Sequence, residues 1–153
     1  MAPSPRGMYF EEFEVGLRIA TASRTITEAD IVSFAGLTGD YNQLHTDAEF
    51  AAETPYGKRV AHGVLTLSYA LGLAVQQGFI EGTTLAFREL SWKFNAPVFI
   101  GDTIHLETEV VETKPMRRLG GGLVVLKARV VNQKGETAQR GEWRVLMASR
   151  PEG

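Results

Sequence analysis

The chain has 153 residues, of which 44% are hydrophobic and 22% are charged. This length suits one domain with a single buried core, and this composition excludes intrinsic disorder and collagen-like repeats for most of the chain. Its 16 Lys and Arg residues against 18 Asp and Glu residues give a formal net charge of −2 without any basic block. We therefore expect no binding of nucleic acid through a basic face.

The absence of cysteine excludes disulfides, thiolate nucleophiles and cysteine-based metal sites. Residues 1–8 contain Pro3 and Pro5 with no apolar stretch behind them. They predict a flexible tail and no secretory signal, ahead of one domain over residues 9–149. The longest apolar run, residues 64–75, is shorter than the roughly 20 residues that span a bilayer. We expect a cytoplasmic protein with no membrane partner.

The first part of the chain predicts one short strand and two helices. Apolar alternation favours a strand near residues 15–22. Thr27, followed by Asp30 three residues later, resembles a capping box at the start of a helix. That helix leads into a turn-rich corner at residues 39–42, and residues 46–52 form a second short helix, capped by its first or second residue.

The remainder predicts a long helix followed by strands. Residues 63–77 are apolar on every face, which is typical of a helix buried all round. Alternation then predicts four strands, at residues 84–96, 102–113, 122–132 and 137–148. In the first of these strands the apolar residues switch from odd-numbered to even-numbered positions near Arg88 and Glu89, which indicates a bulge.

No helix separates these four strands, so we expect them to pair antiparallel. The fold class is α+β, with one long buried helix wrapped by a bent antiparallel sheet of about five strands.

Three histidines are the candidates for acid–base chemistry near neutral pH: His45, His62 and His105. His105 lies on the polar face of a strand, where a solvent-facing role is favoured. His62 directly precedes Gly63 at the start of the long helix, so packing or capping is favoured for its side chain.

A polar loop next to the long helix contains Asp40, Asn42 and His45. At this spacing an Asp and a His fit a structural turn as well as a functional site. A carboxylate and an imidazole held together can share acid and base duties toward one water molecule. Gly63 adds the free N–H groups and positive end of a helix N-terminus, which are the elements of an oxyanion hole.

A metal site on Asp40, His45, Asp47 and His62 is the competing interpretation. His45 and His62 stand 17 residues apart, and no pair of histidines has the spacing of a helical metal motif, so no metal is expected. Residues 120–122 are three glycines without the Lys-Ser or Lys-Thr of a phosphate-binding loop.

Residues 35–47, with the sequence AGLTGDYNQLHTD, resemble the signature of the MaoC-like, R-specific enoyl-CoA hydratases, which have the hot-dog fold. Residues 60–65 and 94–102 resemble two further blocks of that family, in the same order. The resemblance spans roughly residues 9–148. It implies the helix wrapped by a bent sheet that periodicity also predicts.

The resemblance implies that Asp40 and His45 are the catalytic acid and base, and that the backbone N–H of Gly63 is the oxyanion-hole donor. Asn42 matches a position that supports the loop, and His62 is a further supporting candidate. Gln43 departs from the family's pattern, because relatives usually have proline there. The dihedral angles of the loop are then less restricted.

Two further features of the site follow from the same comparison with the family. Some relatives have a serine eight residues after the glycine, where this chain has Leu71, and Ser68 is the nearest hydroxyl. Candidates for lining the substrate site, each also explained by core packing, are Leu67, Leu71, Trp92 and Phe94.

The implied activity is the reversible syn addition of water to a trans-2-enoyl thioester, which gives a (3R)-3-hydroxyacyl thioester and needs no cofactor or metal. The implied partners are an acyl-CoA substrate and a second copy of the chain, in a homodimer or higher homo-oligomer with sites near the interface.

Two other functions stay open. A hot-dog acyl-CoA thioesterase generally needs a carboxylate on the central helix, and residues 63–77 contain no Asp or Glu. A non-catalytic acyl-CoA-binding protein has no chemical reason to keep Asp40, Asn42, His45 and Gly63 together.

Overall fold

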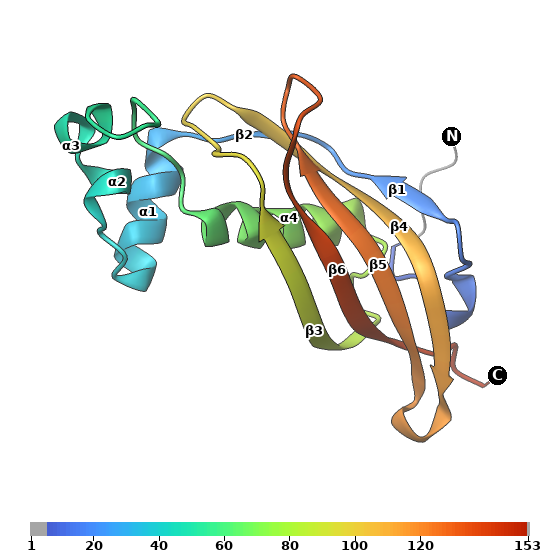
Figure 1. Cartoon of the computed structure of the whole chain (residues 1–153). Coiled ribbons are helices and arrows are strands. Elements are labelled where there is room, and N and C mark those ends of the chain that lie inside the picture. The colour runs from blue at the N-terminus through green and yellow to red at the C-terminus, as the bar shows by residue number, and fades with distance from the viewer. Residues whose placement is uncertain (1–5, 153) are drawn as a thin grey trace.

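A computed structural model describes residues 6–152 of the chain. The 15-residue helix α4 (Gly63–Gln77) lies across one face of a bent antiparallel sheet (Figure 1). The six strands are β1 (Arg18–Ala20), β2 (Arg24–Thr25), β3 (Thr84–Phe94), β4 (Thr103–Met116), β5 (Gly121–Val131) and β6 (Thr137–Ala148). Their order is β1-β4-β5-β6-β3, and β2 also pairs with β4. The predicted α+β hot-dog arrangement is confirmed, with six strands where about five were expected.

The three shorter helices gather at one end of α4 (Figure 1). They are α1 (Glu28–Thr38), α2 (Gln43–Thr46) and α3 (Ala48–Ala52), and two 3-10 turns, η1 (Phe10–Glu12) and η2 (Arg117–Leu119), complete the described elements. None of the described helices is long and apolar enough to cross a membrane.

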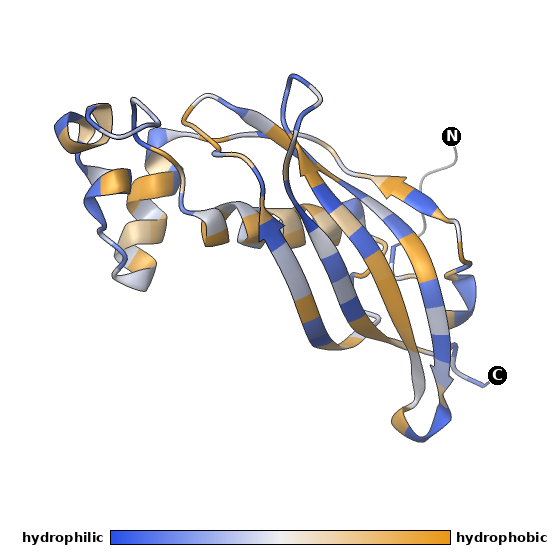
Figure 2. Ribbon diagram, viewed as in Figure 1, coloured by the Kyte–Doolittle hydropathy of each residue, from blue (hydrophilic) through white to orange (hydrophobic). Residues whose placement is uncertain are grey.

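The strands follow the predicted alternation, which Figure 2 shows as bands of opposite hydropathy. In β4, Ile104 and Leu106 are fully buried, whereas the intervening His105 is partly exposed and pairs with Glu107 at 3.0 Å. The predicted bulge is confirmed, because the pairing of β3 with β6 shifts register between Phe87 and Glu89.

Helix α4 has the predicted bounds, but the expectation that it is buried all round is wrong. Leu65 and Ala70 are fully buried, whereas Val64 is 54% exposed and Val75 is 44% exposed. Ser68 also lies on the exposed side. The described part of the chain bends around one side of the helix, so the apolar residues of the other side are left uncovered.

The boundary of the expected N-terminal tail also needs correction. The Gly7 N–H donates to the Gly78 carbonyl at 2.6 Å, and the Met8 N–H donates to the Phe79 carbonyl at 3.1 Å. Met8 is only 6% exposed. The segment therefore joins the fold before residue 9, while residues 1–5 lie outside the described part.

A polar network fixes α1 on α4. Thr27 and Asp30 form the predicted capping box, with mutual backbone-to-side-chain bonds of 2.8 and 3.3 Å. The Asp30 carboxylate also accepts from Tyr69 of α4 at 2.8 Å and from Arg24 of β2 at 3.0 Å. The Arg24 guanidinium stacks 3.9 Å from the centre of the Tyr69 ring, so strand, cap and helix share one cluster.

This network predicts acid-sensitive stability. Burial raises the pKa of Asp30, but hydrogen bonds from Thr27, Tyr69 and Arg24 outweigh burial and hold it below the ordinary 3.8. Because the pKa of Asp30 is lower in the folded state than in the unfolded state, its carboxylate stabilises the fold at pH values above the unfolded-state pKa. This contribution is lost as the pH falls through the folded-state pKa.

We expect Asp30→Asn to lower the free energy of unfolding by about 1.5–3 kcal/mol at pH 7. The difference in free energy of unfolding between the variant and wild type should shrink below pH 3.8, the ordinary pKa of an aspartate. Urea titrations at pH 7 and pH 3 measure both differences, and Glu14→Gln, at an exposed position, is the control. A difference in free energy of unfolding that is the same at both pH values would contradict the ionic role of Asp30.

Candidate active site

The loop after α1 is built from side-chain caps on successive N–H groups. Helix α1 ends at Gly39, whose φ of 80° is the left-handed conformation that glycine adopts readily. The Asp40 carboxylate accepts from the Asn42 N–H at 3.2 Å, and the Asn42 side chain accepts from the Leu44 N–H at 3.2 Å. Asn42 thereby caps the short helix α2, which carries His45 and which the sequence did not predict.

Gln43, at the position where relatives usually have proline, is the first residue of α2. The N–H at this position has no partner within the helix. The preceding Asn42 has φ −50° and ψ 133°, an extended conformation that also suits the residue before a proline. The Asn42 cap therefore holds the loop in a shape that proline would also favour.

His45 is held from two sides. Its Nδ1 lies 2.7 Å from the Val60 carbonyl oxygen, which can only accept, so Nδ1 carries the proton and Nε2 is left free. The Arg59 Nε donates to the His45 carbonyl at 2.7 Å, and the Arg59 guanidinium pairs with Glu28 at 2.8 Å. The ring of His45 is consequently fixed while one nitrogen stays available.

His62 connects the loop to the long helix. Its side chain is only 2% exposed, and its Nε2 donates to the Asp40 carbonyl at 2.9 Å. Its ring stacks on His45 with the centroids 3.8 Å apart, and the Phe34 ring lies 4.9 Å away. The packing role predicted for His62 is thus a direct contact with both candidate catalytic residues.

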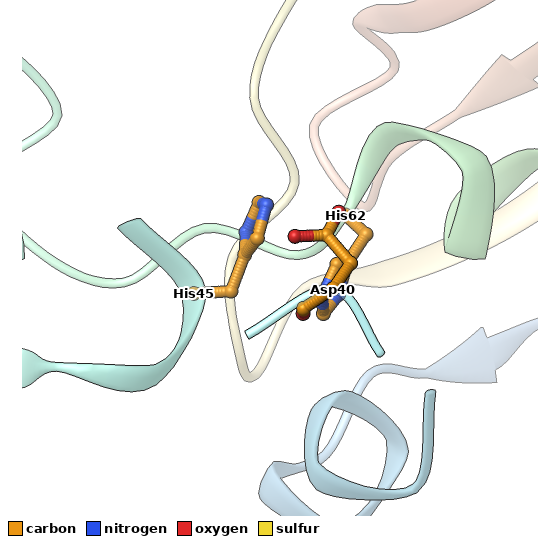
Figure 3. A group of neighbouring side chains, drawn as sticks. All are labelled: Asp40, His45 and His62. Atoms are coloured by element: carbon orange, nitrogen blue, oxygen red, sulfur yellow. The ribbon is translucent and has the colours of Figure 1, made fainter. Parts of the chain in front are cut away.

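Asp40, His45 and His62 form one group, with one potential ligand atom of each within 4.8 Å of the others. Figure 3 shows the Asp40 carboxylate pointing toward the His45 ring. A shared metal ion needs both imidazole lone pairs, which lie in the ring planes, to converge about 2 Å from each nitrogen. The two rings are stacked 3.8 Å apart with only 29° between their planes, so their lone pairs lie in separate, nearly parallel planes. This geometry favours acid–base chemistry over chelation.

The N-terminus of α4 completes the site. His62 is the N-cap residue but makes no side-chain cap, so it leaves the first N–H groups of the helix unpaired by its side chain. A Cβ atom on Gly63 would stand 2.7 Å from the Phe94 ring, so a larger residue there would displace that ring. These N–H groups and the helix dipole favour negative charge at this end.

A pocket of about 520 Å³ connects His45 with the N-terminus of α4. It is lined by His45 of α2, by Gly63 and Val64 of α4, and by Phe94 of β3. Asp40 is exposed and is not part of the pocket wall, so it meets the site through its approach to His45. A larger hollow of about 1090 Å³ lies elsewhere on the sheet among charged residues and contains none of these groups.

The other predicted site residues lie apart from the pocket. Of the four candidates for lining the substrate site, only Phe94 belongs to its wall. Leu67 is buried in the core, and Leu71 and Trp92 pack against that core. The Ser68 hydroxyl donates to the Val64 carbonyl at 2.7 Å on the exposed side of α4, away from the pocket.

Three residues near the site were missed from the sequence. Gln139 of β6 and Thr66 of α4 are buried and line the pocket, and Arg59 holds His45. Gln139 lies four residues before the buried Trp143 on the same strand, so both side chains point to the same face. A polar residue on this core-facing side was the available signal. Arg59 gave no comparable signal, because its contacts depend on the folded loop.

The geometry agrees with what the chain is similar to. Residues 13–132 match the MaoC-like domain, and the chain belongs to this family. A 3-hydroxybutyryl-CoA dehydratase of Methylorubrum extorquens is 41% identical over 120 residues, which cover 77% of this chain and 73% of the relative. An (R)-specific enoyl-CoA hydratase of Aeromonas caviae is 36% identical over 138 residues, covering 88% of this chain and 96% of the relative.

A solved structure of a monoamine oxidase regulatory protein from Archaeoglobus is also similar, with a TM-score of 0.86 and 39% identity. The match covers 95% of this chain and 97% of that chain. The proteins similar to this chain therefore include some named as hydratases or dehydratases and a protein named as a regulator.

We expect Gln43→Pro to be accommodated and to raise the free energy of unfolding by about 0.4–1 kcal/mol, because it restricts the unfolded chain at a compatible position. Urea unfolding measures the change. Leu44→Pro, which removes the N–H bonded to Asn42, is the opposite control and should destabilise the protein. A destabilising Gln43→Pro would contradict the conformation described for α2.

Proposed function

We propose that the chain is an (R)-specific enoyl-CoA hydratase, which adds water reversibly to a trans-2-enoyl thioester. One observation carries the proposal. Asp40 and the free nitrogen side of His45 come together beside the N-terminus of α4, where Gly63 lines the pocket. An acid–base pair and an anion-stabilising helix end are the two requirements of this reaction.

The spacing of the pair suits one water molecule. Two groups that each bind the same water at about 2.8 Å stand roughly 4.5–5 Å apart. The upper limit of 4.8 Å between a carboxylate oxygen of Asp40 and a ring nitrogen of His45 is compatible with such a bridge. One group removes a proton as the water oxygen bonds to C3, and the other supplies the proton that C2 gains. The reverse sequence releases water.

The thioester oxygen gains negative charge as water adds to C3. The Gly63 N–H and the positive end of α4 stabilise this charge in a pocket whose walls are partly apolar, where such interactions are stronger than in bulk water. All the groups that this step requires belong to the chain and the substrate.

The competing functions have less support. A thioesterase would use a carboxylate on the central helix, but α4 has no Asp or Glu and none lines the pocket. A regulatory or binding role agrees with the name of the Archaeoglobus protein. It gives no reason for His45 to be fixed with one nitrogen free beside a carboxylate.

The activity can be tested with crotonyl-CoA. We expect wild-type protein to consume the enoyl-thioester absorbance and to form the R alcohol, as chiral chromatography would show. Asp40→Asn and His45→Gln should each lower kcat by about 10²–10⁴-fold, the usual contribution of a general acid or base. Added EDTA should leave the rate unchanged.

His105→Gln is the matched control, because this third histidine lies on β4 outside the pocket. Its rate should equal that of wild type. Release of free thiol instead of hydration would support the thioesterase, and wild-type rates in both site variants would refute the assigned pair.

The substrate pocket also suggests how the chain assembles. Strand β3 is the last strand of the sheet order and leaves one backbone edge unpaired by the described strands. Its exposed apolar residues are Leu85, Phe87, Leu90 and Phe94, and the exposed side of α4 adds Val64 and Val75. Phe94 and Val64 also form part of the pocket wall. We propose that a second copy pairs along β3, covers this surface and closes the pocket.

We expect Leu90→Arg to weaken this dimer, because it places a charge on the apolar β3 surface. Sedimentation velocity should show a dimer for wild type and a shift toward monomer for the variant, with a loss of hydration rate. Val15→Arg, at a residue that is 65% exposed outside β3 and α4, should remain dimeric. A monomeric wild type with full activity would refute the assembly.

A further inference from the structure

Gln139 is a buried amide at the site with no role in the mechanism above. It is 2% exposed and lies on β6. Its Oε1 accepts from the Trp92 indole N–H at 2.8 Å, and its Nε2 donates to the Gly63 carbonyl at 3.0 Å. An indole can only donate and a carbonyl can only accept, so the two neighbours allow just one orientation of the amide.

The sheet places these partners together. Gln139 pairs directly with Phe94 in the register of β6 and β3, and Trp92 pairs with Gly141. A Cβ atom on Gly141 would collide with the Ser91 carbonyl and would stand 2.8 Å from the Trp92 ring, so the glycine allows both the close approach of β3 and the position of that ring. The indole thus reaches the neighbouring Gln139 diagonally.

The bond to Gly63 acts on the first turn of α4. The Gly63 carbonyl shares a peptide unit with the Val64 N–H, one of the helix N–H groups without a partner in its own turn. A hydrogen bond to a carbonyl polarises the N–H of the same peptide unit and restricts its rotation. The Phe94 ring packs on Gly63 at the same place.

We infer that Gln139, oriented by Trp92, is a positioning residue. It fixes the Gly63–Val64 peptide unit and polarises the Val64 N–H, the next helix N–H after that of Gly63, so that this helix end is preorganised for the developing charge on the thioester oxygen. This rests on the proposed hydratase function. The contribution belongs to the transition state, so it is expected in kcat more than in KM.

Gln139→Glu is the sharpest test. The introduced side chain can donate to the Gly63 carbonyl only when it is protonated, and as a carboxylate it would face that oxygen with a second acceptor. We expect the kcat of this variant to fall as pH rises through the titration of the introduced group, relative to wild type. KM should change by less than about threefold.

Gln139→Leu removes both bonds and should lower kcat by about tenfold at every pH, less than the 10²–10³-fold loss of a direct oxyanion donor. Trp92→Phe leaves the amide without its orienting donor and should give a smaller loss. Arg140→Gln is the control, since Arg140 is exposed at the neighbouring position and does not line the pocket.

Nuclear magnetic resonance separates this inference from the proposed function. The Val64 amide proton should move upfield in Gln139→Leu and stay in place in Arg140→Gln, whether or not the protein hydrates crotonyl-CoA. An unmoved Val64 resonance, or a Gln139→Glu variant with the pH profile of wild type, would overturn the role of Gln139. If the wild-type protein does not hydrate crotonyl-CoA but the Val64 resonance still shifts in Gln139→Leu, only the hydratase function is overturned.

Discussion

The site depends on one buried ring, that of His62. Its ring stacks on His45 at 3.8 Å, its Nε2 donates to the Asp40 carbonyl at 2.9 Å, and it is the N-cap residue of α4. The stacking and the hydrogen bond are each worth about 1 kcal/mol, a modest amount by themselves. Their value is geometric, because one residue sets the distance between the acid–base pair and the helix N-terminus.

The rest of the fold keeps that junction rigid. Asp30 fastens α1 to α4, and Arg59 fastens α2 to Glu28 at the start of α1. The β3–β6 pair supports the other side of the helix end through Phe94 and Gln139. Asp40 lies in a loop and His45 in the short helix α2, and this segment is braced from three directions. Such bracing reduces the reorganisation that the reaction would otherwise require.

Local patterns in the sequence predicted much of the fold. The bounds of α4 follow from a mostly apolar segment that is followed by Gly78, and the α1 cap follows from two residues three apart. The bulge in β3 was visible in the sequence because the apolar residues switch from odd-numbered to even-numbered positions. Each of these features is determined by residues close together in the chain.

The missed features depend on contacts between distant residues. Gln139 lies 47 residues from Trp92 and 76 from Gly63, so no local pattern shows that the amide joins them. Helix α2 has four residues and rests on one Asn42 cap, too short a segment for periodicity to reveal. The exposed side of α4 was misread because apolar periodicity shows which residues need covering but not whether the same chain covers them.

The mechanism is tested most directly by following crotonyl-CoA in D₂O with the wild-type protein. Nuclear magnetic resonance and chiral analysis of the product should show 3-hydroxybutyryl-CoA with the R configuration at C3 and one deuterium at C2. A group that exchanges its proton with solvent carries deuterium in D₂O, so it delivers deuterium to C2. An S product, or free CoA with no hydroxyacyl thioester, would contradict hydration by Asp40 and His45.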